Sequence, residues 1–222
     1  MELLSCHLDV FTLMKGFPMK RLFVTSDDHF YHKNIIKYCN RPWNHGLDEE
    51  DEMIVTDQDV LNMNYDLIEN WNSVVNKNDI VINLGDFCLG GKKLLQERVT
   101  TILRKLNGEK YLLLGNHDLY DIDFYKNCGF RKVYDKPILW DDNFMFSHRP
   151  LVTRWSNRDW ILNAPFINVF GHVHNSPYDI VNDLKIPLEH VTLKTYCCCV
   201  ELTDYKPVLL SDVLTITSKK KQ

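Results

Sequence analysis

The chain has 222 residues, of which 45% are hydrophobic and 25% are charged, and its formal net charge is −4. This length allows one sizeable hydrophobic core, and the composition is typical of a globular protein. A pI of about 6.1 excludes the broad basic surface that holds nucleic acid, so high-affinity duplex binding is not expected. No apolar stretch reaches the length of a membrane span.

The 7 cysteines include no C-x-x-C pair. This odd number, without a metal-binding spacing, favours free thiols in a reducing cytosol over a disulfide framework or a structural zinc site. The first residues lack the basic segment and apolar core of a signal peptide. We expect an N-terminal extension over residues 1–18 that need not belong to the core, a single domain over 19–213 and a C-terminal tail over 214–222.

Apolar runs alternate with helical patterns in the first half of the chain. Buried strands are expected over residues 21–26, 80–84 and 110–114. Residues 57–75 and 94–106 carry apolar side chains three or four positions apart, which is typical of amphipathic helices. Shorter helices are expected over residues 32–38 and 121–127.

The second half of the chain is rich in short strands. They are expected over residues 131–134, 137–140, 144–146, 167–170, 195–202 and 208–210. Strand-helix-strand units followed by a strand-rich half predict a layered α/β sandwich.

Five of the expected strands end at a polar cluster. In chain order the clusters are Asp27-x-His29, Gly85-Asp86, Gly115-Asn116-His117-Asp118, His148, and Gly171-His172-x-His174. Each cluster alone is compatible with a helix cap, a turn or a buried histidine. Their coincidence favours one shared site, because ligands and acids tend to lie where parallel strands end.

Aspartate, histidine and asparagine are oxygen and imidazole donors, and this set suits manganese, iron, zinc or nickel. Residues two apart on an extended segment point the same way. On that ground we expect Asp27 and His29 to reach one site, and we expect the same of His172 and His174. Asp28 should face away.

The order D-x-H, G-D, G-N-H-D, H and G-H-x-H closely resembles the calcineurin-like metallophosphoesterase superfamily, in particular its small single-domain members from bacteriophages and bacteria. The five blocks span residues 27–174, and the flanks resemble that family from about Met19 to Val213. The resemblance implies an α/β/β/α sandwich of mixed sheets. It is specific for the fold and the metal site, but not for the substrate.

The resemblance also implies two divalent metal ions, with manganese the best choice in vitro. The first ion would be bound by Asp27, His29 and His174, the second by Asn116, His148 and His172, and Asp86 would bridge the two. A hydroxide that bridges the ions would attack phosphorus in line. His117 would be the general acid for the departing oxygen, and Asp118 would orient His117 or raise its pKa.

Two arginines are the candidates for substrate binding. Arg149 directly follows a proposed ligand and Arg41 precedes a proline, and either could hold a phosphate oxygen bidentately, although a surface salt bridge is the alternative for both. The Gly-Asn-His-Asp form resembles that of cyclic-nucleotide phosphodiesterases, whereas protein phosphatases usually have glutamate after the histidine. The expected substrate is therefore a phosphodiester, or a monoester, of a small nucleotide.

Two other functions stay open at this point. A nuclease that acts on DNA or RNA ends is disfavoured by the acidic balance. A catalytically silent, metal-bound interaction module is disfavoured by the complete ligand set and by His117. The favoured interpretation is a cytoplasmic hydrolase with a small phosphorylated partner, no membrane association and no strong nucleic-acid binding.

Overall fold

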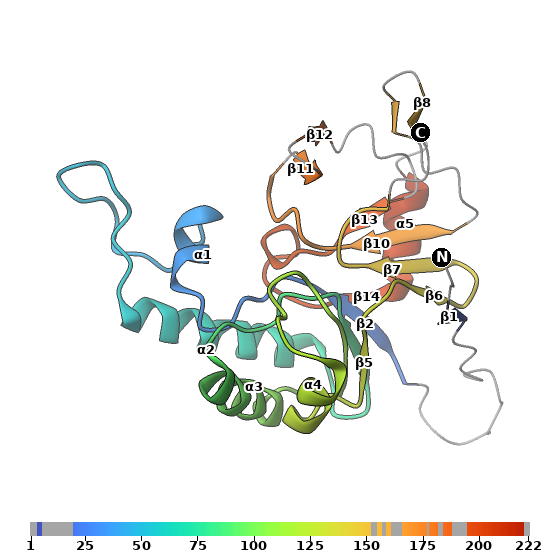
Figure 1. The fold of residues 1–222 in the computed structure, drawn as a ribbon, viewed down its shortest axis with the longest axis horizontal. Helices are drawn as coiled ribbons and strands as arrows, with labels where there is room; N and C mark the ends of the chain where they lie inside the picture. Colours follow the sequence, from blue (N-terminus) through green and yellow to red (C-terminus); the bar gives the residue numbers. More distant parts are fainter. Residues whose placement is uncertain are drawn as a thin grey trace.

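The computed structural model describes residues 4–5, 20–151, 155–156, 159–160, 166–176, 178–181, 184–187 and 195–219. In this part of the chain, two five-stranded sheets and five α-helices form a layered body (Figure 1). None of the helices described is both long enough and apolar enough to cross a membrane.

The first sheet has the strand order β14-β2-β3-β4-β5. Its parallel strands are β2 (Leu22–Thr25), β3 (Ile80–Asn83), β4 (Glu109–Leu113) and β5 (Lys132–Tyr134), and β14 (Val208–Leu209) pairs antiparallel with β2. The connections contain α1 (Lys33–Tyr38), α2 (Asp57–Val74), α3 (Lys92–Lys105) and α4 (Ile122–Cys128). The alternation expected from the hydrophobic pattern is thus confirmed.

The second sheet has the strand order β1-β6-β7-β10-β13. Its strands are β1 (Leu4–Ser5), β6 (Ile138–Trp140), β7 (Phe144–Ser147), β10 (Ile167–Phe170) and β13 (Thr195–Cys197). β7, β10 and β13 are parallel, and β6 is antiparallel to β7. Because β1 pairs with β6, part of the expected N-terminal extension belongs to the sheet.

Smaller elements complete the second half. β8 (Trp155–Ser156) pairs antiparallel with β9 (Asp159–Trp160), and β11 (Tyr178–Val181) pairs antiparallel with β12 (Leu184–Pro187). The strand expected over residues 195–202 ends at Cys197, and a 3₁₀ turn (Val200–Leu202) replaces its last part.

Both faces of the first sheet are buried, because successive strand residues point to opposite sides. On one face, Phe23 and Val81 pack against the helices, with Trp71 of α2. On the other, Val24 and Ile82 meet side chains of the second sheet. The expected sandwich of two mixed sheets with helices is confirmed.

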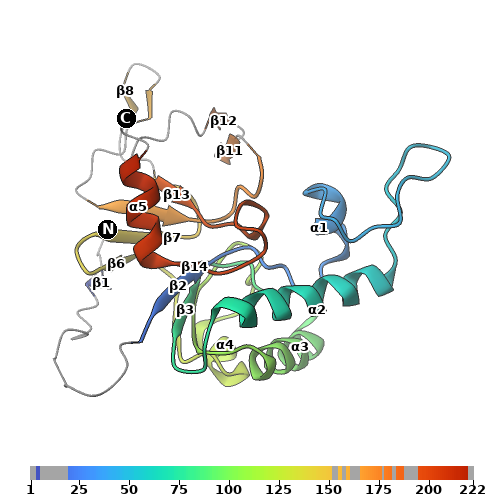
Figure 2. The same ribbon diagram turned by 180° about the vertical axis from the view of Figure 1, so that it is seen from behind.

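Helix α5 (Leu210–Lys219) was not expected from the sequence. It contacts β2 and β14 of the first sheet and β13 of the second, and it crosses the strands of the second sheet in Figure 2. Leu210, Val213 and Thr217 are buried at helical spacing. The expected boundary between domain and tail at residue 213 therefore falls inside a helix.

Hydrogen bonds connect the loops that follow the strands of both sheets. The Asp27 amide donates to the Gly85 carbonyl at 2.9 Å, which joins the loops after β2 and β3. The His172 amide donates to Asp27 Oδ2 at 2.8 Å, which joins the loop after β10 to the first sheet. The polar clusters of both sheets are thereby brought to one place.

Candidate metal centre

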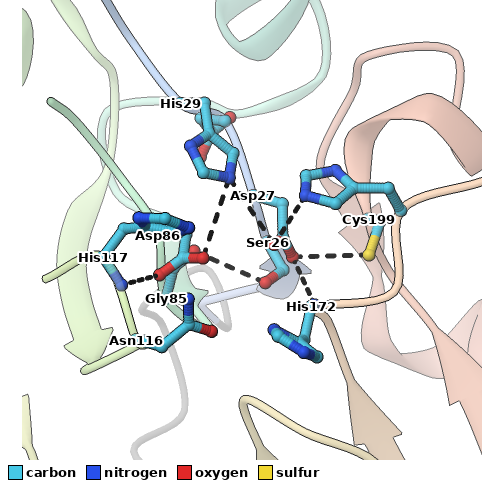
Figure 3. Close-up of polar contacts among 12 residues, drawn as sticks. Ser26, Asp27, His29, Gly85, Asp86, Asn116, His117, His172 and Cys199 are labelled. Carbon is cyan, nitrogen blue, oxygen red and sulfur yellow. Dashed lines mark hydrogen bonds and ion pairs between the residues drawn. The ribbon is translucent and has the colours of Figure 1, made fainter. Parts of the chain in front are cut away.

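The expected metal ligands lie in two adjacent groups. The first consists of Asp27, His29 and His174, and the second of Asp86, His148 and His172, with the ligand atoms of each group within 4.8 Å of one another. Asp86 joins the two groups, because its Oδ2 lies 3.7 Å from His29 Nε2 and 3.4 Å from His148 Nε2 (Figure 3). Asn116 Oδ1 lies 2.9 Å from His148 Nε2, so the seventh expected ligand is also present.

Two ligand atoms in the first group are buried and lack a hydrogen-bond partner among the described residues. They are Asp27 Oδ1 and His29 Nε2, which lie 3.9 Å apart. Leaving such atoms unsatisfied costs free energy, and buried polar atoms are nearly always paired. A carboxylate oxygen and an imidazole nitrogen that face each other in this way fit a divalent cation of the kind expected.

Three of the expected histidine ligands have their Nδ1 atoms engaged away from the centre. The partners are His32 Nδ1 at 3.1 Å for His29, the Leu84 carbonyl at 2.8 Å for His148, and Glu201 Oε1 at 3.0 Å for His174. Such contacts fix the orientation of a ring. They leave Nε2 of each ring facing the carboxylates.

At five of the seven expected ligands the backbone is left-handed and not extended. Asp27, His29, Asp86, His172 and His174 all have positive φ, between 51° and 73°. We expected residues two apart to point the same way because their segment would be extended. The side chains do lie together, but the backbone is left-handed, so the reason given for the expectation is wrong. Left-handed backbone is uncommon outside glycine and gathers at functional sites. Hydrogen bonds from backbone amides hold this conformation, such as the one that the His29 amide donates to the Asp86 carbonyl at 3.0 Å.

The Gly115-Asn116-His117-Asp118 loop lies directly on Asp86. A Cβ atom at Gly115 would collide with Asp86 Oδ1, so glycine is required for this approach. Asp86 Oδ1 accepts a hydrogen bond from the His117 amide at 2.7 Å. Asn116 and His117 are exposed, and the His117 ring lies 5.4 Å from the His29 ring, at the open side of the centre.

Asp118 does not have the position expected for a partner of the His117 ring. Its carboxylate accepts from the amides of Gly115 at 2.9 Å, Asp86 at 2.7 Å and Phe87 at 3.3 Å. Burial and then the charge of Asp86 raise the pKa of Asp118 to about 6. The expected role is thus corrected: Asp118 ties the loop that contains Gly115 to the loop after β3.

Arg41 is also placed differently from the expectation. Its side chain is fully buried and is bonded to Glu201 and to the backbone carbonyls of Asp27 and Asp28. A substrate phosphate does not reach a guanidinium enclosed in this way. Arg41 instead holds Glu201 and the backbone of Asp27 in place. Glu201 was missed in the sequence, because it follows His174 by 27 residues and belongs to none of the motifs.

Arg149, by contrast, is exposed beside the second group. Burial, the charge of His148 and the charge of Arg149 lower the pKa of His172 to about 3. Arg149 thus adds positive charge beside the second group, since it directly follows His148 in the chain.

Asp86 and His148 shift each other's pKa within the centre. Burial alone would raise the pKa of Asp86, but the hydrogen bond and charge of His148 outweigh burial and lower it. Burial alone would lower the pKa of His148, but the bond to Asp86 and nearby carboxylates raise it to about 9. The buried His148 imidazole and Asp86 carboxylate thus each stabilise the charged form of the other.

This fold and donor set define the class of metal-dependent phosphoesterases. Residues 20–207 match the family model of the calcineurin-like phosphoesterases, and the chain therefore belongs to that family. The resemblance inferred from the five motifs is confirmed.

The chain is also similar to individual proteins of known sequence or structure. The chain is 33% identical over 206 residues to the uncharacterized protein MJ1445 of Methanocaldococcus jannaschii, a match that covers 91% of this chain and 94% of that one. The crystal structure of the protein of unknown function AQ665 from Aquifex aeolicus superposes with a TM-score of 0.57 at 22% identity, and the match covers 89% of this chain and 99% of that one. The nuclease MPE of Pseudomonas putida gives a TM-score of 0.42 at 18% identity, over 77% of this chain and 70% of that one.

Proposed function

We propose that this chain is a dinuclear metal-dependent phosphoesterase that hydrolyses a phosphodiester of a small nucleotide. The observation that carries the proposal is the pair of buried atoms Asp27 Oδ1 and His29 Nε2, which lack partners among the described residues; His29 Nε2 also lies 3.7 Å from Asp86 Oδ2. A hydrolase that needs two cations at one phosphate requires this kind of arrangement.

The chain supplies two ligand sets that share one carboxylate. Asp27, His29 and His174 hold one ion, Asn116, His148 and His172 hold the other, and Asp86 serves both. Manganese, iron, zinc and nickel suit these donors, and we expect manganese to support activity in vitro. When bound, the two ions neutralise the phosphoryl oxygens and activate the attacking water.

His117 is the proposed general acid. Its amide is held by Asp86 Oδ1 and its ring is exposed at the open side of the centre, where a leaving oxygen can reach it. Protonation of that oxygen avoids the formation of a free alkoxide, which is the contribution of a general acid.

The preference for a small nucleotide is supported by the residues around His117. Arg149 places a positive charge at the centre, where it can pair with a phosphate oxygen. The His32 ring lies 6.2 Å from that of His117 and 6.4 Å from that of Tyr38, a residue that is 74% exposed. Exposed rings of this kind can stack on a nucleobase.

We also propose that the enzyme acts in the cytosol. The six cysteines that the structure describes are free thiols, including the neighbours Cys197 and Cys199, whose sulfur atoms lie 3.4 Å apart. Reduced thiols at this spacing suit a reducing compartment.

The test is a hydrolysis screen of the full chain with Mn²⁺. The panel contains bis(4-nitrophenyl) phosphate, 2′,3′- and 3′,5′-cyclic nucleotides, nucleoside monophosphates and short oligonucleotides. We expect His117→Ala to keep both ions and to lose about 10²- to 10⁴-fold in kcat on the nucleotide diesters, the usual contribution of a general acid. The loss should be smaller for the aryl diester, whose leaving group needs less protonation.

Asn116→Ala is the matched variant in the same loop, and we expect it to lose one ion. If the chain cleaved oligonucleotides preferentially, its function would be that of a nuclease and not the hydrolysis of a small nucleotide. If the manganese-loaded protein turned over no mono- or diester, the enzyme proposal would fail and an interaction module would remain.

A further inference from the structure

A buried chain of charged side chains lies behind the first ligand group. Arg41 Nη2 donates to Glu201 Oε1 at 2.6 Å, and the same oxygen lies 3.0 Å from His174 Nδ1. The side chain of Arg41 is fully buried and that of Glu201 is 3% exposed. Such a pair of charges is costly to desolvate, so its burial next to a candidate ligand requires an explanation.

The position of Glu201 relative to the His174 ring explains why this pair of charges is buried here. The other ring nitrogen, Nε2, lies 3.6 Å from Asp27 Oδ1 in the first ligand group. A carboxylate on Nδ1 fixes the tautomer that leaves Nε2 free to bind a cation, and it makes the imidazole a stronger donor. The counterpart for His148 is only the neutral Leu84 carbonyl, and for His29 it is the His32 ring.

Arg41 contacts both Glu201 and the backbone of the first ligand group. Besides Glu201, its guanidinium donates to the carbonyls of Asp27 at 2.7 Å and Asp28 at 2.9 Å. One rigid cation thus holds the backbone of a ligand and the carboxylate that orients another ligand. The planar fork of arginine suits this task, and a lysine would not reproduce it.

We propose that Glu201 is a positioning residue that acts through His174 to set the affinity of the ion bound by Asp27, His29 and His174, and that Arg41 holds Glu201 in place. The inference rests on the metal-binding part of the proposed function and is independent of the substrate. Mutation of a residue that hydrogen-bonds to a metal ligand typically lowers metal affinity 10- to 100-fold.

The experiment measures Mn²⁺ affinity of the full chain by isothermal titration in a double-mutant cycle. Glu201→Gln keeps the shape of the side chain and removes its charge. We expect it to weaken one of the two binding steps about 10- to 100-fold and to leave the other within about threefold. In the His174→Ala protein, Glu201→Gln should have no further effect, because the residue it acts through is gone.

Glu97→Gln, on the exposed side of α3, is the matched control and should bind Mn²⁺ as the unchanged protein does. Thermal unfolding in EDTA checks that each variant is folded. If Glu201→Gln does not fold, Arg41→Lys is measured in its place, and the same single step should weaken.

Unchanged affinity in the folded variant, equal weakening of both steps, or a full additional loss in the His174→Ala protein would overturn the inference. The outcome is separable from that of the proposed function. A chain that binds two Mn²⁺ ions and hydrolyses no ester would refute the enzyme while leaving the effect of Glu201 measurable.

Discussion

At the residue scale, the centre depends on loops that approach more closely than side chains normally allow. Gly115 is the clearest case, because a Cβ atom there would meet Asp86 Oδ1 and also the His148 ring. Gly171 has the same relation to Ser26 and Asp27. The glycines in the motifs thus serve the packing of the ligand loops.

Gly115→Ala tests this point. We expect the displaced Asp86 carboxylate to reduce Mn²⁺ binding at both positions and the strain to lower the free energy of unfolding by about 1–3 kcal/mol, as overpacking usually does. Metal content and urea unfolding measure the two effects. Gly91→Ala is the control, since a Cβ there meets nothing within 4 Å. Normal metal content in the Gly115 variant would contradict the close approach.

Individual residues show what the sequence could and could not predict. The seven candidate ligands lie together in the structure, and the sequence indicated them because each follows an apolar strand within a motif. Arg41 was assigned to substrate because a sequence does not reveal that a charged side chain is buried with a partner, here Glu201, 160 positions away. The left-handed backbone at Asp27 and His29 depends on bonds to another loop, so spacing alone could not predict it.

At the element scale, helix α2 shows how local sequence positions the scaffold. Thr56 and Asp59 form a capping box: the Asp59 amide donates to Thr56 Oγ1 at 3.3 Å, and the Thr56 amide donates to Asp59 Oδ2 at 2.7 Å. Asp59 Oδ1 also lies 3.0 Å from His45 Nδ1. Periodicity predicted α2 and α3, whereas α5 was missed because its short apolar stripe was assigned to a strand and the tail.

Asp59→Asn should show a pH-dependent loss of stability. Burial alone would raise the pKa of Asp59, but its bonds with Thr56 and the contact with His45 lower it. The stabilisation is therefore present above the unfolded pKa of about 4 and is lost as the pH falls through the lower folded pKa. At pH 7 we expect a loss of about 1 kcal/mol, the usual value of a helix cap.

Urea unfolding at pH 7 and near pH 3 checks this expectation, and the difference between the two proteins should shrink at the lower pH. Asp57→Asn is the control, because its carboxylate is 95% exposed in its pair with Lys33 and such pairs contribute little. A loss that is the same at both pH values would contradict the role of the Asp59 charge.

At the scale of the whole molecule, the two sheets must pack together for the centre to exist. Asp86 and Asn116 come from the first sheet, and His148 and His172 from the second. Helix α5 packs Val213 into the core that both sheets share. The order of the motifs predicted this convergence, but the contribution of α5 was not part of the prediction.

Val213→Ala should lower the free energy of unfolding by about 2 kcal/mol, because the side chain is fully buried and its loss leaves a cavity between the sheets. Leu214→Ala, at the next position and 43% exposed, should change it by less than about 0.5 kcal/mol. Equal losses in urea unfolding would contradict the placement of α5.

The central claim is that one centre holds two metal ions across the junction of the sheets. An anomalous-difference map from crystals of the Mn²⁺-loaded protein tests it most directly. We predict two peaks about 3.5–4 Å apart on either side of Asp86, one against Asp27, His29 and His174 and one against Asn116, His148 and His172. A map without peaks there, or with its only peak at the nearby group of Cys39, His174 and Glu201, would contradict the account.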